Sequence, residues 1–150
     1  ENTLHAMQDK IDTLKKSASS KQARIKEVDE LLRMVDYYKS GKPAADKLKS
    51  IRFEKSRQKY KSEHDNELRT FYMAERKLKP YFKDGKLPIT AWRKERAQLE
   101  QEYRDIQTEL SPLHADAKKL WAIHYNIYEV QHEQERQNTE LRQKKQEIEH

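Results

Sequence analysis

Residues 92–130 read WRKERAQLEQEYRDIQTELSPLHADAKKLWAIHYNIYEV and carry an apolar residue at every seventh position. This spacing is typical of a helix that packs along one narrow seam, as in a coiled coil. The seven-spaced set is Trp92, Leu99, Ile106, Leu113, Leu120 and Ile127, and the interleaved set includes Tyr103, Leu110, Ala117 and His124. The register does not slip at Pro112, so the pattern predicts a helix over about 88–130 that kinks there and does not stop.

The last twenty residues keep the register but lose most of the apolar side chains. Leu141 and Ile148 continue one set, whereas the other set becomes Gln131, Asn138 and Lys145. Such a segment can bury little. We therefore predict that residues 131–150 form a polar helical extension or a frayed tail. Self-association of the chain through this tail is one possible function.

A similar seam over residues 2–40 predicts the first helix. Its apolar positions are Leu4, Ile11, Ala18, Ile25 and Leu32, with Met7, Leu14, Val28 and Val35 between them and one polar lapse at Lys21. Gly41 and Pro43 predict the end of this helix and the start of the next.

A looser helical pattern over 43–82 predicts the second helix, with a bend or break within 48–53. Pro80 and the turn Asp84–Gly85 mark its end. Three helices running up, down and up would leave the first and third parallel. We predict an all-α fold: an elongated antiparallel three-helix bundle or helical hairpin over 1–130, with coiled-coil packing and one very long C-terminal helix.

Composition excludes several classes of protein. The 150 residues are 39% charged and 34% hydrophobic, with two glycines and no cysteine. No disulfide framework, thiolate zinc site or glycine-rich phosphate loop can be built from them. No apolar run approaches the roughly 18 residues of a membrane span, so we expect no membrane partner. The chain begins at Glu1 without Met, and we interpret it as a piece of a longer protein.

The positive charge is concentrated in one segment. The net charge is +6, and residues 42–86 alone carry fourteen basic and seven acidic side chains. Arg52, Lys55 and Lys59 would share a face of a continuous helix, which suits contacts to several phosphates. The candidate DNA-binding residues are Lys47, Lys49, Arg52, Lys55, Arg57, Lys59, Tyr60 and Lys61. Two alternatives stay open. One is that the basic run is only a solvated helix face. The other is that Phe53 and Tyr60 are core residues and not stacking platforms for unpaired bases.

Catalytic chemistry has little support in the residues. The histidines His5, His64, His114, His124, His132 and His150 are scattered, and none lies four residues from another. Tyr37 and Tyr38 lack the metal or base that a tyrosine nucleophile needs. We predict no catalytic residues, no metal and no cofactor, and therefore no enzymatic activity in this fragment.

The middle of the chain resembles the helical region behind the nuclease domain of relaxases, the mobilisation nucleases of Gram-positive conjugative and integrative elements. The residues that carry the resemblance are Ile51-Arg52-Phe53, the pattern Tyr60, His64, Glu67 and Leu68, the aromatic and basic stretch to Tyr81-Phe82, Lys86-Leu87-Pro88 and Tyr103-Arg104. It covers about residues 4–130 and includes neither the metal-binding histidines nor a nucleophilic tyrosine in context.

The resemblance implies a noncatalytic accessory module in plasmid mobilisation or conjugative transfer, located in the bacterial cytoplasm. Its implied partners are single-stranded or nonspecific DNA and the proteins of the relaxosome or transfer machinery. The alternative is a structural coiled-coil module that binds or oligomerises with protein and does not bind nucleic acid.

Overall fold

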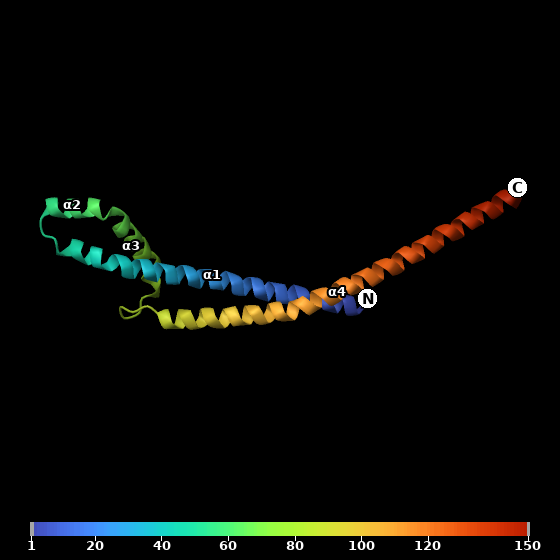
Figure 1. The fold of residues 1–150 in the computed structure, drawn as a ribbon, viewed down its shortest axis with the longest axis horizontal. Helices are drawn as coiled ribbons and strands as arrows, with labels where there is room; N and C mark the ends of the chain where they lie inside the picture. The colour runs from blue at the N-terminus through green and yellow to red at the C-terminus, as the bar shows by residue number, and fades with distance from the viewer. Residues whose placement is uncertain (1, 150) are drawn as a thin grey trace. The chain divides into compact units, whose positions relative to one another are not determined.

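The computed structural model describes residues 2–149 and is all-α, as predicted. Its helices are α1 (Asn2–Ser50), α2 (Glu54–Glu63), α3 (Asp65–Leu78), the 3₁₀ turn η1 (Lys79–Tyr81) and α4 (Ile89–Glu149) (Figure 1). Within these residues no β-strand is formed, and Lys83 and Lys86 make a single isolated bridge.

The predicted end of the first helix at residues 41–43 is wrong, because α1 continues to Ser50. Gly41 is buried under α3: a Cβ there would lie 2.6 Å from the Phe71 Cβ and 3.3 Å from the Glu67 carbonyl oxygen. Pro43 removes one intrahelical hydrogen bond, but its ring is exposed and the helix passes through it. Gly41 therefore allows the close approach of α3 and does not end the helix.

The break falls instead at residues 51–53, inside the segment where a bend was expected. The Ser50 hydroxyl donates to the Lys47 carbonyl (2.6 Å), and the Ile51 amide donates to the Leu48 carbonyl (3.3 Å). The helix predicted over 43–82 is therefore broken within 48–53 as expected, but it starts inside α1 and is divided again, so that this segment contains the end of α1, α2, α3 and η1. α2 and α3 meet at His64, whose backbone (φ −117°, ψ 26°) leaves helical geometry.

The connection between α3 and α4 contains the predicted turn at Asp84–Gly85. Both residues have positive φ, 52° and 75°, and the flanking Lys83 and Lys86 exchange two backbone hydrogen bonds of 2.9 Å. This geometry is the two-residue turn that Asp-Gly favours. Figure 1 shows α3 crossing α1 steeply, and the first part of α4, which follows this turn, running opposite to α1.

The predicted parallel arrangement of the first and third long helices is therefore wrong. α1 and α4 are antiparallel, because later residues of α1 pair with earlier residues of α4. The ion pairs are Lys10–Glu109 (3.4 Å), Lys21–Glu102 (2.8 Å), Arg24–Glu95 (2.6 Å) and Asp29–Arg96. The polar lapse at Lys21 is explained by its carboxylate partner on α4.

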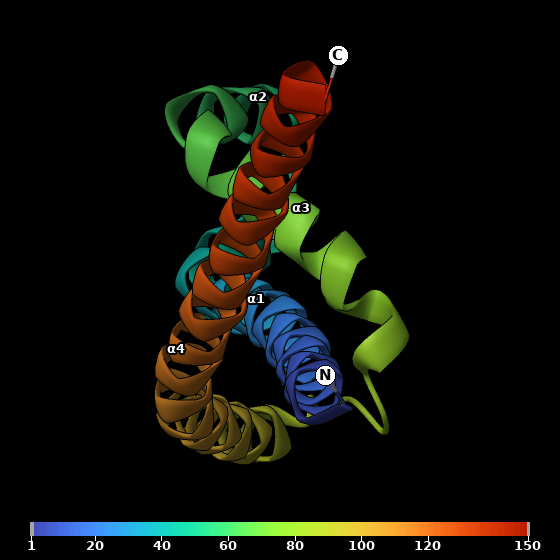
Figure 2. The ribbon, with the colours of Figure 1, turned by 90° about the vertical axis from the view of Figure 1, so that its right-hand side faces the viewer.

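The chain divides into two compact units, which we describe separately. The unit Ser19–Arg104 has two cores where α3 packs obliquely on α1 (Figure 2). One core joins α1 to α3 and α4 through Val28, Leu31, Met34, Val35, Ala74, Leu78 and Trp92. The other joins α1 to α3 through Ala44, Ala45, Leu48, Leu68 and Phe71.

The second unit comprises the described parts of Glu1–Ala18 and Asp105–His150. Its buried side chains come from both helices: Leu4, Ile11, Ala18, Ile106, Leu110 and Ala117. α4 runs without interruption through Pro112 to Glu149, and the side chains of residues 131–148 are all exposed. In the described residues the tail is thus a solvated helix, one of the two forms that we expected.

Candidate nucleic-acid interface

The predicted DNA-binding cations gather at the end of α1, in the link 51–53 and on α2. Lys47 and Lys49 lie in the last turn of α1, and Arg52 lies in the link. The ten residues of α2 include four cations, Lys55, Arg57, Lys59 and Lys61, and none of the ten is buried. We call these seven side chains the basic tip.

The charges of the basic tip are not neutralised locally. Six of the seven cations are exposed, and Arg57 is half-buried. Among the side chains of residues 3–148, no carboxylate lies within ion-pair distance of any of the seven. The Lys47 ammonium lies 5.5 Å from the centre of the Tyr60 ring, a cation–π contact that leaves its charge in place.

The seven cations of the basic tip lie on different faces and do not form one stripe. Arg52 precedes α2, so the predicted helical face of Arg52 with Lys55 and Lys59 is wrong. On α2, Lys55 and Lys59 are four residues apart and share one face, while Arg57 and Lys61 share another. A nucleic-acid backbone that can bend around the basic tip fits this distribution better than a straight duplex.

The structure separates the two aromatic residues of the basic tip region. Phe53 is 78% exposed, immediately between Arg52 and α2. The Tyr60 ring is half-buried against the second core, and it stacks on His64 with ring centres 4.1 Å apart. Phe53 therefore has a free ring face, whereas Tyr60 fixes α2 to the rest of its unit.

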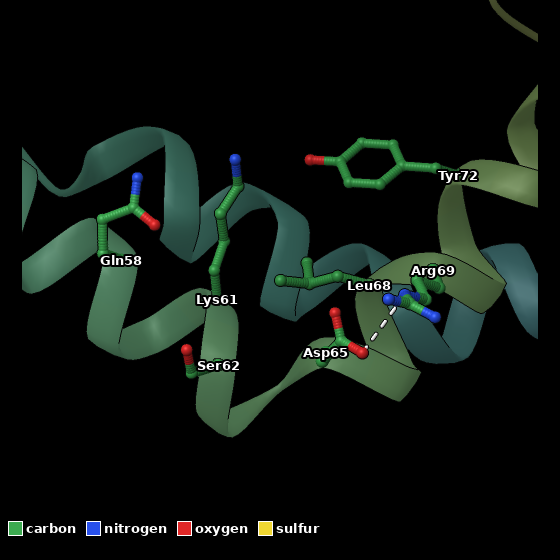
Figure 3. A pocket seen from close by; sticks show the side chains of 7 residues that line it. All are labelled: Gln58, Lys61, Ser62, Asp65, Leu68, Arg69 and Tyr72. Carbon is green, nitrogen blue, oxygen red and sulfur yellow. Dashed lines mark ion pairs between the residues drawn. The ribbon is translucent and has the colours of Figure 1, made fainter.

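A polar hollow of about 630 Å³ lies where α2 bends into α3 (Figure 3). Gln58, Lys61 and Ser62 line it from α2, and Asp65, Leu68, Arg69 and Tyr72 line it from α3. Figure 3 shows the Tyr72 hydroxyl and the Lys61 ammonium turned toward the same opening. Arg69 pairs with Asp65 (3.1 Å), so Lys61 is the cation of this hollow without an acidic partner among the described residues. The Lys61 ammonium and the Tyr72 hydroxyl are donors that suit a phosphate oxygen.

The histidines are not brought together. Among residues 2–149, no group of three or more His, Cys, Asp or Glu side chains could hold a metal ion, and His150 lies outside the described residues. The buried Nδ1 atom of His64 has no hydrogen-bond partner within that range. Over the same residues, no helix is both long and apolar enough to cross a membrane.

One surface was not recognised as a site from the sequence. Trp121, Ile123, Tyr125, Ile127, Tyr128 and Val130 on α4 are each 50–63% exposed. Residues 120–128 are also the longest stretch without Asp, Glu, Lys or Arg in a chain that is 39% charged. That lack of charge was the signal available in the sequence, but the heptad pattern made these residues look like part of a covered seam.

Comparison with protein-family models, with curated proteins and with solved structures finds no match to this chain. Any functional inference therefore depends on the residues themselves and on where the structure places them.

Proposed function

We propose that this chain is a noncatalytic helical module that binds DNA nonspecifically through the basic tip. The observation that carries the proposal is the set of seven cations around one short exposed helix, none of which has an ion-pair partner in the described part of the chain. Cations in this state can release the counterions of a nucleic-acid backbone when they contact phosphates. Phosphate contacts carry no sequence information, which is why we propose nonspecific binding.

Single-stranded DNA is the form that we favour. Phe53 presents its ring beside Arg52, and an exposed aromatic among cations is the arrangement that holds unpaired bases. Cations on different faces of α2 also suit a strand that can bend. Tyr60 enters the proposal as the residue that positions α2 and not as a stacking platform, because His64 occupies one face of its ring.

The resemblance to the helical region of relaxases supplies the context for this proposal. In that context the module would hold transferred DNA, or contact relaxosome and transfer-machinery proteins, in the cytoplasm of a bacterium. The parent protein would supply the nicking chemistry.

Binding of labelled single-stranded oligonucleotide at increasing salt tests the proposal. With about six phosphate contacts, the affinity should fall roughly 100- to 1,000-fold between about 50 and 200 mM salt. The variant with Lys49→Glu, Arg52→Glu, Lys55→Glu and Lys59→Glu should lose at least 100-fold in affinity at low salt. Tight binding that depends neither on salt nor on these residues would contradict the proposal.

A matched control separates the basic tip from the overall charge. The variant with Lys83→Glu, Lys86→Glu, Lys144→Glu and Lys145→Glu changes the net charge by the same amount at exposed positions outside the tip. Its affinity should fall less than tenfold. An equal loss in both variants would show that only the net charge matters.

A further inference from the structure

The uncovered apolar surface of α4 has two ordered stripes. Trp121, Tyr125 and Tyr128 recur at intervals of four and three residues, so they form an aromatic stripe on one side. Ile123, Ile127 and Val130 recur at the same intervals and form an aliphatic stripe on the other side. Leu120 and His124 lie between the stripes, in register with the seam positions Leu110, Leu113 and Ala117. We call residues 120–130 the apolar segment.

The apolar segment continues a seam that another helix already covers. Ile106, Leu110 and Ala117 are buried on α4 in the unit where α1 contributes Leu4, Ile11 and Ala18. Beyond that part, α4 continues without α1 beside it (Figure 1). The surface that would receive an antiparallel helix is thus present, and in the described residues nothing occupies it.

The exposed area reaches the lower limit for a specific contact between two copies. An aromatic side chain buries about 150–250 Å² when it is covered, so the three half-exposed aromatics leave roughly 250–450 Å² per copy. Two copies, with the three aliphatic side chains of each added, reach about 1,000 Å², the size at which interfaces become specific. Each free copy thus exposes about 500 Å² of these side chains, the size of the largest apolar patch on a typical monomer, which is often functional.

The residues also determine the orientation that fits. In an antiparallel pair each flank of a helix faces the same flank of the other copy, so aromatic meets aromatic and aliphatic meets aliphatic. The charges at the two ends of the segment agree with this orientation. Asp116, Lys118 and Lys119 at one end sum to +1, whereas Glu129, Glu133, Glu135 and Arg136 at the other sum to −2, with Arg136 paired to Glu133 (2.7 Å). A parallel pair would place like charges together.

We propose that two copies of this chain associate through the apolar segment of α4 as an antiparallel, two-fold symmetric pair. The axis passes near Asn126, close to the middle of the segment. This proposal moves self-association from the polar tail at 131–150 to the residues that precede it, and it does not depend on DNA binding.

Sedimentation equilibrium of the full chain tests the association. We expect a dimer at about 10–100 µM, within the range of weak specific interfaces. The variant with Trp121→Glu and Ile127→Glu should be monomeric over that range. Both side chains are at least half-exposed, so far-UV circular dichroism should report an intact helical fold. A monomeric wild-type chain would overturn the proposal.

A second pair of substitutions distinguishes the segment from the tail. Leu141→Glu with Ile148→Glu also replaces two apolar side chains by Glu, at positions that are 64% and 85% exposed. This variant should still form the dimer. If it is monomeric while the first variant dimerises, the tail and not the apolar segment is the interface, and the proposal is wrong.

The orientation has its own measurement, because the chain contains no cysteine. A single spin label at Gln137→Cys would lie about 11 residues from the axis on each copy. At 1.5 Å per residue, antiparallel pairing predicts a label separation of about 35 Å along the helices. A separation below about 20 Å would indicate parallel pairing and would overturn the antiparallel arrangement.

Discussion

Gly41 predicts a helix end from the sequence, but in the structure it is a packing site within α1. Its missing Cβ lets α3 approach α1 so closely that the Phe71 Cβ occupies the space. Phe71 in turn stacks on Tyr38, with ring centres 5.0 Å apart. The close approach of these two helices therefore depends on the absence of a single methyl group.

Gly41→Ala should destabilise the chain despite its better helix propensity. Overpacking costs about 1–3 kcal/mol, and replacing Gly by Ala in a helix returns about 1 kcal/mol. We expect a net loss of about 0–2 kcal/mol in the free energy of unfolding by urea. Ser40→Ala, at the exposed neighbouring position, should be neutral or slightly stabilising. Stabilisation by Gly41→Ala would show that α3 does not pack on this residue.

Phe53 is the residue whose exposure bears most directly on the proposed function. Phe53→Ala should weaken binding of single-stranded DNA by about 1–3 kcal/mol, the usual value of one stacked base. Binding of a duplex should change little, because paired bases are not available to the ring. Phe53→Trp, which retains the stacking surface, should bind at least as well as the wild type. Equal losses for single-stranded and duplex DNA would argue against stacking.

At the scale of the element, α2 is a helix that its own residues cannot sustain. Ten residues are too few for a stable isolated helix in water, and α2 has no buried residue. Its main anchor is the Tyr60 ring, held between the second core, His64 and Lys47. The four cations of α2 therefore depend for their position mainly on one half-buried aromatic side chain.

Tyr60→Ala should release α2 and weaken DNA binding while every cation remains present. Hydrogen exchange should show amide protection in α2 falling at least about tenfold, which corresponds to about 1.4 kcal/mol of local stability. Protection in the α1 residues of the first core should persist. Lys59→Ala, at an exposed position of the same helix, should leave protection unchanged. Unchanged protection in Tyr60→Ala would show that other contacts hold α2.

At the scale of the whole molecule, charge links the long helices as well as defining the tip. A hydrogen bond from Arg24 lowers the pKa of Glu95, and hydrogen bonds from Lys21 and Gln98 lower the pKa of Glu102. A carboxylate whose pKa is lower in the folded state stabilises that state above its unfolded pKa. This contribution is lost as the pH falls through the folded pKa.

The urea midpoint should therefore fall as the pH is lowered below about 4.5, the region in which unfolded Glu titrates. The variant with Glu95→Gln and Glu102→Gln should show a smaller acid-induced fall than the wild type, because two of the responsible groups no longer titrate. Glu140→Gln with Glu147→Gln makes the same charge change in the exposed tail and should retain the wild-type fall. Identical acid responses in all three chains would contradict this account.

The heptad pattern was sufficient to predict an all-α fold and the long C-terminal helix, and a count of charged residues located the positive charge between residues 42 and 86. These features depend on periodicity and composition, which are local properties of the chain. Three features were decided only by contacts between distant residues. α3 covers Gly41 and lets α1 continue to Ser50, the second core takes Tyr60 and leaves Phe53 exposed, and α1 covers one part of the α4 seam but not the apolar segment. A repeating apolar pattern shows which face of a helix can be buried, but the length and position of its neighbours decide how much of that face is covered.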